Sequence, residues 1–188
     1  MDGLKKRVSV LELLLLFFSH FSYTVDAQLD YLQSVNLSSS WTNSRYTLQR
    51  SRDFYDGSQI RPILVVNNTI PSFVFGFFGN GTGIITSFYL VVCFPPDVPM
   101  WFGQPPVVVW SANRDRPVME NATLDLTDGG DLILKDADGI LVWHTNTSGS
   151  SLMLTTAGNL MLVDDKDSAI WQSFDHPTDT WLPSQNIS

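Results

Sequence analysis

The chain has 188 residues, of which 19 are acidic and 11 are Lys or Arg, so its formal net charge is −8. This length suits one ordinary domain and excludes a large multidomain enzyme. Hydrophobic residues make up 44% of the chain and aromatic residues 12%, which excludes a wholly disordered protein. An acidic chain with scattered basic residues has no electrostatic footprint for nucleic acid, so nucleic-acid binding is also excluded.

Residues 1–27 have the pattern of a secretory signal peptide. Three basic residues at 5–7 precede an apolar run at 8–18, and Val25 and Ala27 fit a small-residue cleavage site. The run is shorter than the roughly 20 apolar residues that span a membrane, which weakens the alternative of an uncleaved anchor. We therefore expect a secreted or extracellular chain, attached to a membrane only if a longer form carries a transmembrane helix.

Asparagine acceptors for N-glycosylation are frequent along the chain. Asn-x-Ser/Thr sequons begin at Asn36, Asn67, Asn80, Asn121, Asn146 and Asn186. Six sequons in so short a chain are typical of a glycoprotein surface, although each sequon alone is weak support.

Residues 28–70 read as an N-terminal extension with the first strands. Residues 36–41 are loop-like, Asp56 and Gly57 mark a turn, and residues 63–66 fit a strand that packs on the unit after it.

The chain has one cysteine, Cys93, and therefore no intrachain disulfide. It lies in an apolar stretch at 88–94, so we expect a buried small hydrophobe, with intermolecular pairing as the alternative. A catalytic thiol would need a nearby histidine, and nothing in the sequence links His144 or His176 to it.

Prolines between 95 and 106 frame a loop around Trp101 and Phe102. These two aromatics fit either a surface contact site or a lid on the core.

An internal repeat organises the second half of the chain. Residues 123–144 align with residues 151–172 without a gap, at an offset of 28, and eight of the 22 pairs are identical. This period is typical of repeated supersecondary units. In each copy leucines alternate with polar residues, turns follow, and an apolar strand ends in Trp. A less regular unit runs from about Phe73 to Trp110.

Each of the three units contributes one tryptophan: Trp110, Trp143 and Trp171. The pattern predicts an all-β fold of three small antiparallel sheets around a pseudo-threefold axis. Three tryptophans that meet near this axis would form a core without disulfides.

Three motifs carry a resemblance to a known family. Residues 108–115 (VVWSANRD), 130–134 (GDLIL) and 171–180 (WQSFDHPTDT) resemble the bulb-type (Galanthus-like) lectin domain, especially its version in plant S-locus glycoproteins and G-type lectin S-receptor-like kinases. Residues 56–62 and the SANR segment are similar to the epidermis-secreted glycoprotein branch. The resemblance covers about residues 55–185 and implies a β-prism II fold.

The resemblance and the repeat together imply the domain organisation. A lectin domain spans 71–185, with repeats at about 71–118, 119–148 and 149–185, and residues 186–188 form a truncated tail. In the receptor members a transmembrane helix and a cytosolic kinase follow. No Gly-rich loop, HRD or DFG motif occurs in this chain, so kinase activity does not belong to these residues.

The resemblance also implies candidate carbohydrate-binding positions. The family's mannose motif, Gln-x-Asp-x-Asn-x-Val-x-Tyr, projects alternate side chains from one face of a hairpin. The matching positions are Thr127, Gly129, Asp131, Ile133 and Lys135 in the second repeat, and Thr155, Ala157, Asn159, Met161 and Val163 in the third. Asn159 keeps a polar match, Asp131 a near match, and the register of the first repeat is not evident. We therefore expect degenerate mannose sites.

Other polar clusters have structural explanations. Asp136 and Asp138 are spaced like the start of a calcium loop, but the Glu at its twelfth position is missing, so they fit a hairpin turn. Asp175 and His176 lack the surroundings of a hydrolase dyad, and the histidine spacing fits no zinc pattern. We expect no enzyme, no metal and no cofactor.

Two functional hypotheses remain open. One is an extracellular lectin-like module, in the apoplast or at the cell surface, that recognises a glycan or a protein or peptide ligand for a receptor or as a soluble relative. The other is a structural wall or surface glycoprotein that acts by protein–protein association, such as a homodimer, without binding sugar.

Overall fold

The computed structural model describes residues 32–46, 51–66, 72–81, 83–95, 105–180 and 182. Several expectations lie outside the described residues: the signal peptide at 1–27, the acceptors Asn67 and Asn186, the loop around Trp101 and Phe102, and the tail at 186–188.

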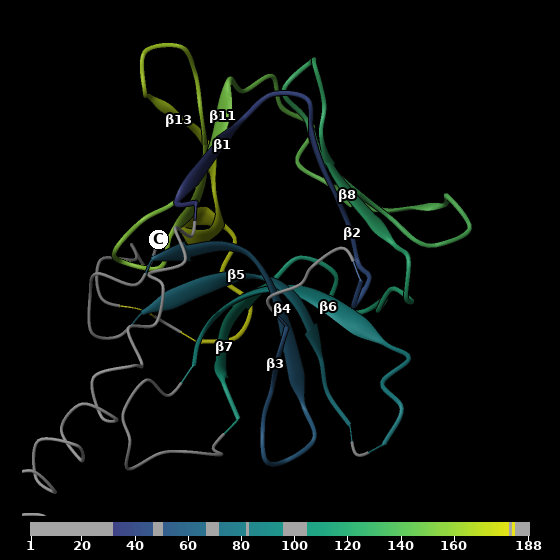
Figure 1. Cartoon of the computed structure of the whole chain (residues 1–188). Coiled ribbons are helices and arrows are strands. Elements are labelled where there is room, and N and C mark those ends of the chain that lie inside the picture. The colour runs from purple at the N-terminus through teal and green to yellow at the C-terminus, as the bar shows by residue number, and fades with distance from the viewer. Residues whose placement is uncertain are drawn as a thin grey trace, which may run out of the picture. The chain divides into compact units, whose positions relative to one another are not determined.

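The all-β prediction is confirmed. The described residues form three antiparallel sheets and one 3₁₀ turn, η2 (Ser173–Asp175). Figure 1 shows the sheets as three sides around a common core, the arrangement of a β-prism.

Each sheet takes its strands mainly from one repeat. In spatial order, the first sheet contains β3 (Arg52–Asp53), β4 (Gln59–Val66), β5 (Phe73–Gly79), β6 (Phe88–Phe94) and β7 (Val107–Ser111). The second contains β10 (Leu141–His144), β9 (Leu132–Lys135), β8 (Thr123–Leu126) and β2 (Ser39–Thr42). The third contains β1 (Ser34–Asn36), β11 (Ser151–Leu154), β12 (Leu160–Val163) and β13 (Ala169–Gln172).

The second and third sheets contain hairpins in the same register. Leu124 pairs with Leu134 in β8–β9, and Leu152 pairs with Leu162 in β11–β12. All four leucines are fully buried, because successive side chains of a strand point to opposite faces and the leucines occupy the inner one. The alternate positions are left on the outer faces of the sheets.

The interpretation of residues 36–41 as a loop is wrong. Residues 34–36 form β1, which pairs with β11, and residues 39–42 form β2, which pairs with β8. Ser38 adopts a left-handed φ of 62° where the chain crosses from one sheet to the other. These short, serine-rich strands have little intrinsic strand propensity; the edges of two later repeats supply their hydrogen-bond partners.

The first sheet is apolar on both faces. Phe75 and Phe77 of β5 join the central core, while Val74 of β5 and Cys93 of β6 lie in a second apolar cluster with Ile60 of β4. Every residue of β5 is buried, which explains its continuous apolar sequence.

The three tryptophans pack against one another and against the central core. The ring centroids of Trp110, Trp143 and Trp171 are 5.7–5.8 Å apart, and each pair of planes is inclined by 70–71°. Edge-to-face packing of this kind is favourable for aromatic rings. The near-equal distances and angles give the pseudo-threefold symmetry of the fold at side-chain level.

Candidate functional site

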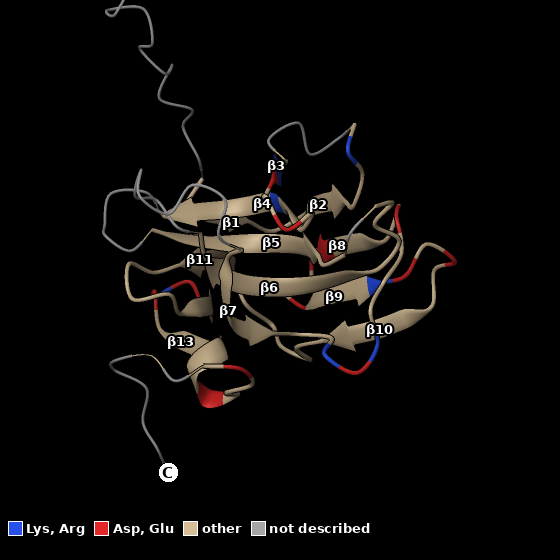
Figure 2. Cartoon of the chain, turned by 90° about the horizontal axis from the view of Figure 1, so that it is seen from below, with Lys and Arg blue, Asp and Glu red and all other residues tan. Residues whose placement is uncertain are grey.

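The candidate sugar positions lie on two equivalent hairpins. Thr127 and Asp131 flank the turn between β8 and β9, and Ile133 and Lys135 are on the outward positions of β9. Thr155, Asn159 and Met161 occupy the same places around β11 and β12. Figure 2 shows that most charged residues lie in turns and at strand ends, so the strand faces carry few charges.

The carboxylate of Asp131 is occupied by neighbouring groups of the chain. It accepts hydrogen bonds from Thr145 Oγ1 at 2.8 Å and from the backbone N of Asn146 at 2.7 Å, and His144 Nδ1 lies 3.2 Å away. Burial by itself would raise the pKa of Asp131, but the hydrogen bonds, first from Thr145, then from His144 and the backbone, lower this pKa below its ordinary value. Asp131 thus holds the segment after β10 against the β8–β9 turn.

Asn159 makes the equivalent tie in the third repeat. Its Nδ2 donates to Gln172 Oε1 at 2.9 Å, and its Oδ1 accepts from Ser173 Oγ at 3.2 Å and from the backbone N of Phe174 at 3.3 Å. The residue is only 7% exposed. Both polar atoms of Asn159 are therefore engaged inside the protein.

The threonines at the start of the motif brace the turns. Thr127 Oγ1 accepts from the backbone N of Asp131, and Thr155 Oγ1 accepts from the backbone N of Asn159, both at 3.1 Å. These local bonds close the two turns in the same way.

The remaining motif positions differ between the repeats. Lys135 Nζ lies 4.0 Å from a carboxylate oxygen of Asp125 on β8. Met161 pairs across the sheet with Met153, and Val163 is only 1% exposed. None of these three side chains supplies the pattern of amide, carboxylate and phenol groups that the mannose motif needs.

The structure supplies the register that the sequence did not reveal in the first repeat. Val91 pairs with Ser111, as Ile133 pairs with His144 in the second repeat. The corresponding outer face of the first sheet carries the second apolar cluster in place of a polar row. A groove of about 250 Å³ opens beside it, lined by Phe78, Tyr89, Val91 and Val108, with Asn80, Ser111, Arg114 and Asp179 as its polar members.

Cys93 lies in that apolar cluster with no exposed surface and no disulfide partner. Burial raises the pKa of its thiol to about 12, because the anionic thiolate is disfavoured where water is excluded. The sulfur is therefore protonated at neutral pH.

Two of the motifs that carry the family resemblance bind each other. Trp110 Nε1 donates to the backbone carbonyl of His176 at 2.9 Å, and the backbone N of Ser111 donates to Thr178 Oγ1 at 2.8 Å. Thr180 N donates to the carbonyl of Val109 at 3.2 Å. The C-terminal motif thus closes the prism by joining the third repeat to β7 of the first.

A charged pair completes this closure. Asp179 accepts from Ser111 Oγ at 2.7 Å and from Arg114 Nη2 at 2.6 Å. Burial would raise the pKa of Asp179, but hydrogen bonds from Ser111, Thr178 and Arg114 and the charge of Arg114 lower it below its ordinary value.

Asp175 and His176, the two residues considered above as a hydrolase dyad, each contact a neighbouring side chain of the third repeat. The ring of His176 stacks on Trp171, with centroids 5.5 Å apart. Both carboxylate oxygens of Asp175 accept from Gln172 Nε2, at 3.0 and 3.1 Å. These contacts fix the turn that leads into the closing motif.

The side chains of Asp136 and Asp138 accept hydrogen bonds from backbone N–H groups. Asp136 Oδ1 accepts from Ala137 N and Met119 N at 2.8 Å, and Asp138 Oδ1 accepts from Ile140 N at 2.9 Å. Across the described ranges, no group of three His, Cys, Asp or Glu side chains is arranged to hold a metal ion. The same residues include no helix that is long and apolar enough to cross a membrane.

Comparisons with known proteins point to one domain type. Residues 107–188 match the D-mannose binding lectin family. The chain is 39% identical over 138 residues to the Arabidopsis thaliana G-type lectin S-receptor-like serine/threonine-protein kinase SD2-2, an alignment that covers 69% of the chain and 16% of the kinase. It is 32% identical over 152 residues to the kinase B120 of the same type and organism, covering 75% of the chain and 16% of that kinase. The chain thus spans about one sixth of the length of these relatives.

Among solved structures, a monomeric monocot mannose-binding lectin from Gastrodia elata matches with a TM-score of 0.41 and 17% sequence identity. The match covers 75% of this chain and 96% of that lectin.

Proposed function

We propose that the chain is an extracellular recognition module whose mannose positions are degenerate, because residues 107–188 match the D-mannose binding lectin family. Its ligand is a glycan, or a protein or peptide, bound by groups other than the motif positions. We further propose that it works as a ligand-binding ectodomain segment, or a soluble relative, of a lectin receptor kinase.

The observation that carries the proposal is that Asp131 and Asn159, the near match and the match to the polar motif, form hydrogen bonds within the protein. Asp131 and Asn159 each bind the chain segment that follows the next tryptophan. A millimolar site has only about 4 kcal/mol of binding free energy. The loss of three hydrogen bonds, each worth about 0.5–1.5 kcal/mol net, removes most of it.

Two features support an extracellular location. The signal-peptide pattern at 1–27 fits secretion. The four sequon asparagines within the described ranges, Asn36, Asn80, Asn121 and Asn146, are all exposed, as attachment of a glycan requires.

The test is a glycan array with the full chain secreted from plant or insect cells, followed by titration with methyl α-mannoside. We expect no mannose binding at micromolar concentration, and no effect of Asp131→Ala or Asn159→Ala on any glycan that does bind. Micromolar mannose binding that either substitution abolishes would contradict the proposal that these sites are degenerate.

One observation favours the alternative of a structural glycoprotein. Ile140 and Leu141, which are consecutive, are 51% and 48% exposed at the start of β10, and Ile170 on β13 is 40% exposed. Exposed apolar side chains of this kind suit protein association. Sedimentation at micromolar concentration distinguishes the two functions: self-association that sugars do not affect, and that Leu141→Ser removes, favours the structural role.

A further inference from the structure

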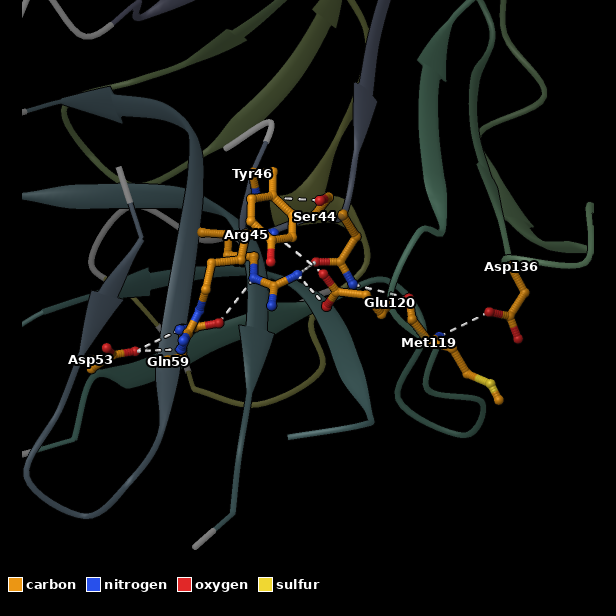
Figure 3. A network of polar contacts seen from close by, with 10 residues as sticks. Ser44, Arg45, Tyr46, Asp53, Gln59, Met119, Glu120 and Asp136 are labelled. Carbon is orange, nitrogen blue, oxygen red and sulfur yellow. Dashed lines mark hydrogen bonds and ion pairs between the residues drawn. The ribbon is translucent and has the colours of Figure 1, made fainter. Parts of the chain in front are cut away.

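A polar cleft separate from the motif positions lies where β2 ends beside β3 and β4. Its volume is about 490 Å³, within the roughly 300–1,000 Å³ range of ligand sites. We call it the Arg61 cleft and define it by six lining residues: Arg45, Tyr46, Asp53, Gln59, Arg61 and Glu120. Figure 3 shows the polar contacts that link the side chains around it.

The floor of the cleft is a buried guanidinium. Arg61 on β4 is 4% exposed, and its Nη1 donates to Asn43 Oδ1 at 2.8 Å and to Glu120 Oε2 at 2.7 Å. Its Nε donates to Gln59 Oε1 at 2.9 Å, and its carbon Cζ lies 4.2 Å from the centroid of the Phe88 ring. These contacts on three sides hold a charge that would otherwise be costly to bury.

One nitrogen of this guanidinium has no hydrogen-bond partner among the residues that the structure describes. In the described part of the chain, Nη2 of Arg61 makes no hydrogen bond, and every fully buried side-chain nitrogen there has one. Nη2 is therefore not fully buried, and Arg61 lines the cleft. The N–H groups of Nη2 are thus the donors of Arg61 that remain available to a molecule in the cleft, and their orientation is fixed because the other nitrogens are held.

The walls add acceptors, a second cation and an aromatic ring. Asp53 accepts from Gln59 Nε2 at 2.5 Å, and Arg45 Nη2 lies 3.7 Å from the same carboxylate. Glu120 Oε1 accepts from the backbone N of Arg45 at 3.2 Å. Tyr46 follows with 87% of its surface exposed.

The charges of the cleft select the class of ligand. Two arginines face two carboxylates, so the site has no net charge, and the chain as a whole carries −8. An anion would gain no long-range attraction from this balance. A ligand whose hydroxyls both donate and accept can satisfy the guanidinium and the carboxylates together, while an exposed tyrosine ring can pack on apolar C–H groups.

We propose that the Arg61 cleft binds a neutral saccharide, and that it supplies the glycan recognition which the degenerate motif positions lack. This inference rests on the proposed function. It assigns the reading of the sugar to Nη2 of Arg61, the guanidinium of Arg45, the carboxylates of Asp53 and Glu120, and the ring of Tyr46.

The test uses the glycosylated full chain on an array of neutral and uronate-containing oligosaccharides, then calorimetric titration with the strongest neutral glycan. Tyr46 and Arg45 are exposed, so we expect the variants Tyr46→Ala and Arg45→Ala to fold like the wild type. We expect each to weaken binding about tenfold, as the loss of one good contact would. The matched controls Tyr55→Ala and Arg52→Ala remove exposed residues that do not line the cleft, and should leave the affinity within about twofold.

Arg61→Lys provides a second readout. It keeps the charge but removes the forked donor, so binding should weaken while the melting temperature stays closer to that of the wild type than in Arg61→Ala. If a neutral glycan binds the wild type, Tyr46→Ala and Arg45→Ala with equal affinity, the Arg61 cleft is not the sugar site, and the proposed function stands. If the chain binds only uronates, the proposal that the cleft binds a neutral saccharide is overturned. If the folded wild type binds no glycan, sugar recognition itself is overturned.

Discussion

The tryptophan cluster offers a direct test of how the prism is held together. We expect Trp143→Ala to lower the free energy of unfolding by about 3–4 kcal/mol. Truncation of a buried aromatic costs about 3–5 kcal/mol, and each edge-to-face pair contributes about 0.5–1.5 kcal/mol. Trp143 makes two such pairs, but it is only half buried, which places the loss in the lower part of that range.

The assay is differential scanning calorimetry of the wild type and the variant. At about 2–4 °C per kcal/mol for a chain of this size, the melting temperature should fall by about 6–16 °C. Tyr55→Ala, which removes a ring that is 92% exposed, is the control and should change it little. A double-mutant cycle with Trp171→Ala should give a coupling of about 0.5–3 kcal/mol. Additive effects, or a loss below about 1 kcal/mol for Trp143→Ala, would refute the role of the cluster.

Three further predictions concern groups whose environment is fixed by the fold. Cys93, with its pKa raised to about 12, should react with an aromatic disulfide at pH 8 only after denaturation in urea; rapid reaction of the native chain would contradict its burial. Asp179→Asn should lower the melting temperature at pH 7. Because folding lowers the pKa of Asp179, the difference in melting temperature between the wild type and the variant should be complete above about pH 5 and should shrink as the pH falls through about 4 and below. A difference that does not change with pH would contradict this prediction. Gly130→Ala should destabilise more than Gly139→Ala. Both glycines have φ near +80°. A Cβ at Gly130 would lie 2.0 Å from the carbonyl oxygen of Gly149, whereas a Cβ at Gly139 would meet open space. Equal melting temperatures of the two variants would contradict a clash at Gly130.

The sequence was sufficient to predict the two regular sheets because their signals are local. Leucines on alternate positions, glycine turns and a terminal tryptophan recur at an offset of 28 without a gap. Each hairpin closes within its own repeat, as the pairs Leu124–Leu134 and Leu152–Leu162 show. Periodicity is informative there because one face is buried and the other is not.

The features that the sequence did not predict depend on contacts between distant segments. β1 and β2 exist because the edges of β11 and β8 provide partners more than 80 residues later. The register of the first sheet was hidden because β5 is buried on both faces, so its sequence does not alternate.

The sequence contains a signal for the internal hydrogen bonds of Asp131 and Asn159. Thr145 follows Asp131 by 14 residues, and Ser173 follows Asn159 by the same interval. A hydroxyl at a fixed spacing from a polar side chain in both repeats indicates a structural pair, because equivalent positions of repeated hairpins face equivalent neighbours.

The two hairpins differ in whether mannose binding can be restored to them. We expect a graft on β8–β9 to give a folded chain that binds methyl α-mannoside with a millimolar Kd, measured by saturation-transfer NMR. The substitutions are Thr127→Gln, Gly129→Asp, Asp131→Asn, Ile133→Val and Lys135→Tyr. Position 129 has room, since the nearest atom to an added Cβ is 3.9 Å away, and Asn159 shows that an amide can hold the equivalent tie. The same graft on β11–β12 requires Val163→Tyr at a residue that is 1% exposed, so overpacking should lower its melting temperature without restoring binding. At about 10 mM mannose, even a site with a binding free energy of only about 3 kcal/mol would be about half filled. If a folded β8–β9 graft binds no mannose at this concentration, the altered side chains are not the reason for weak binding.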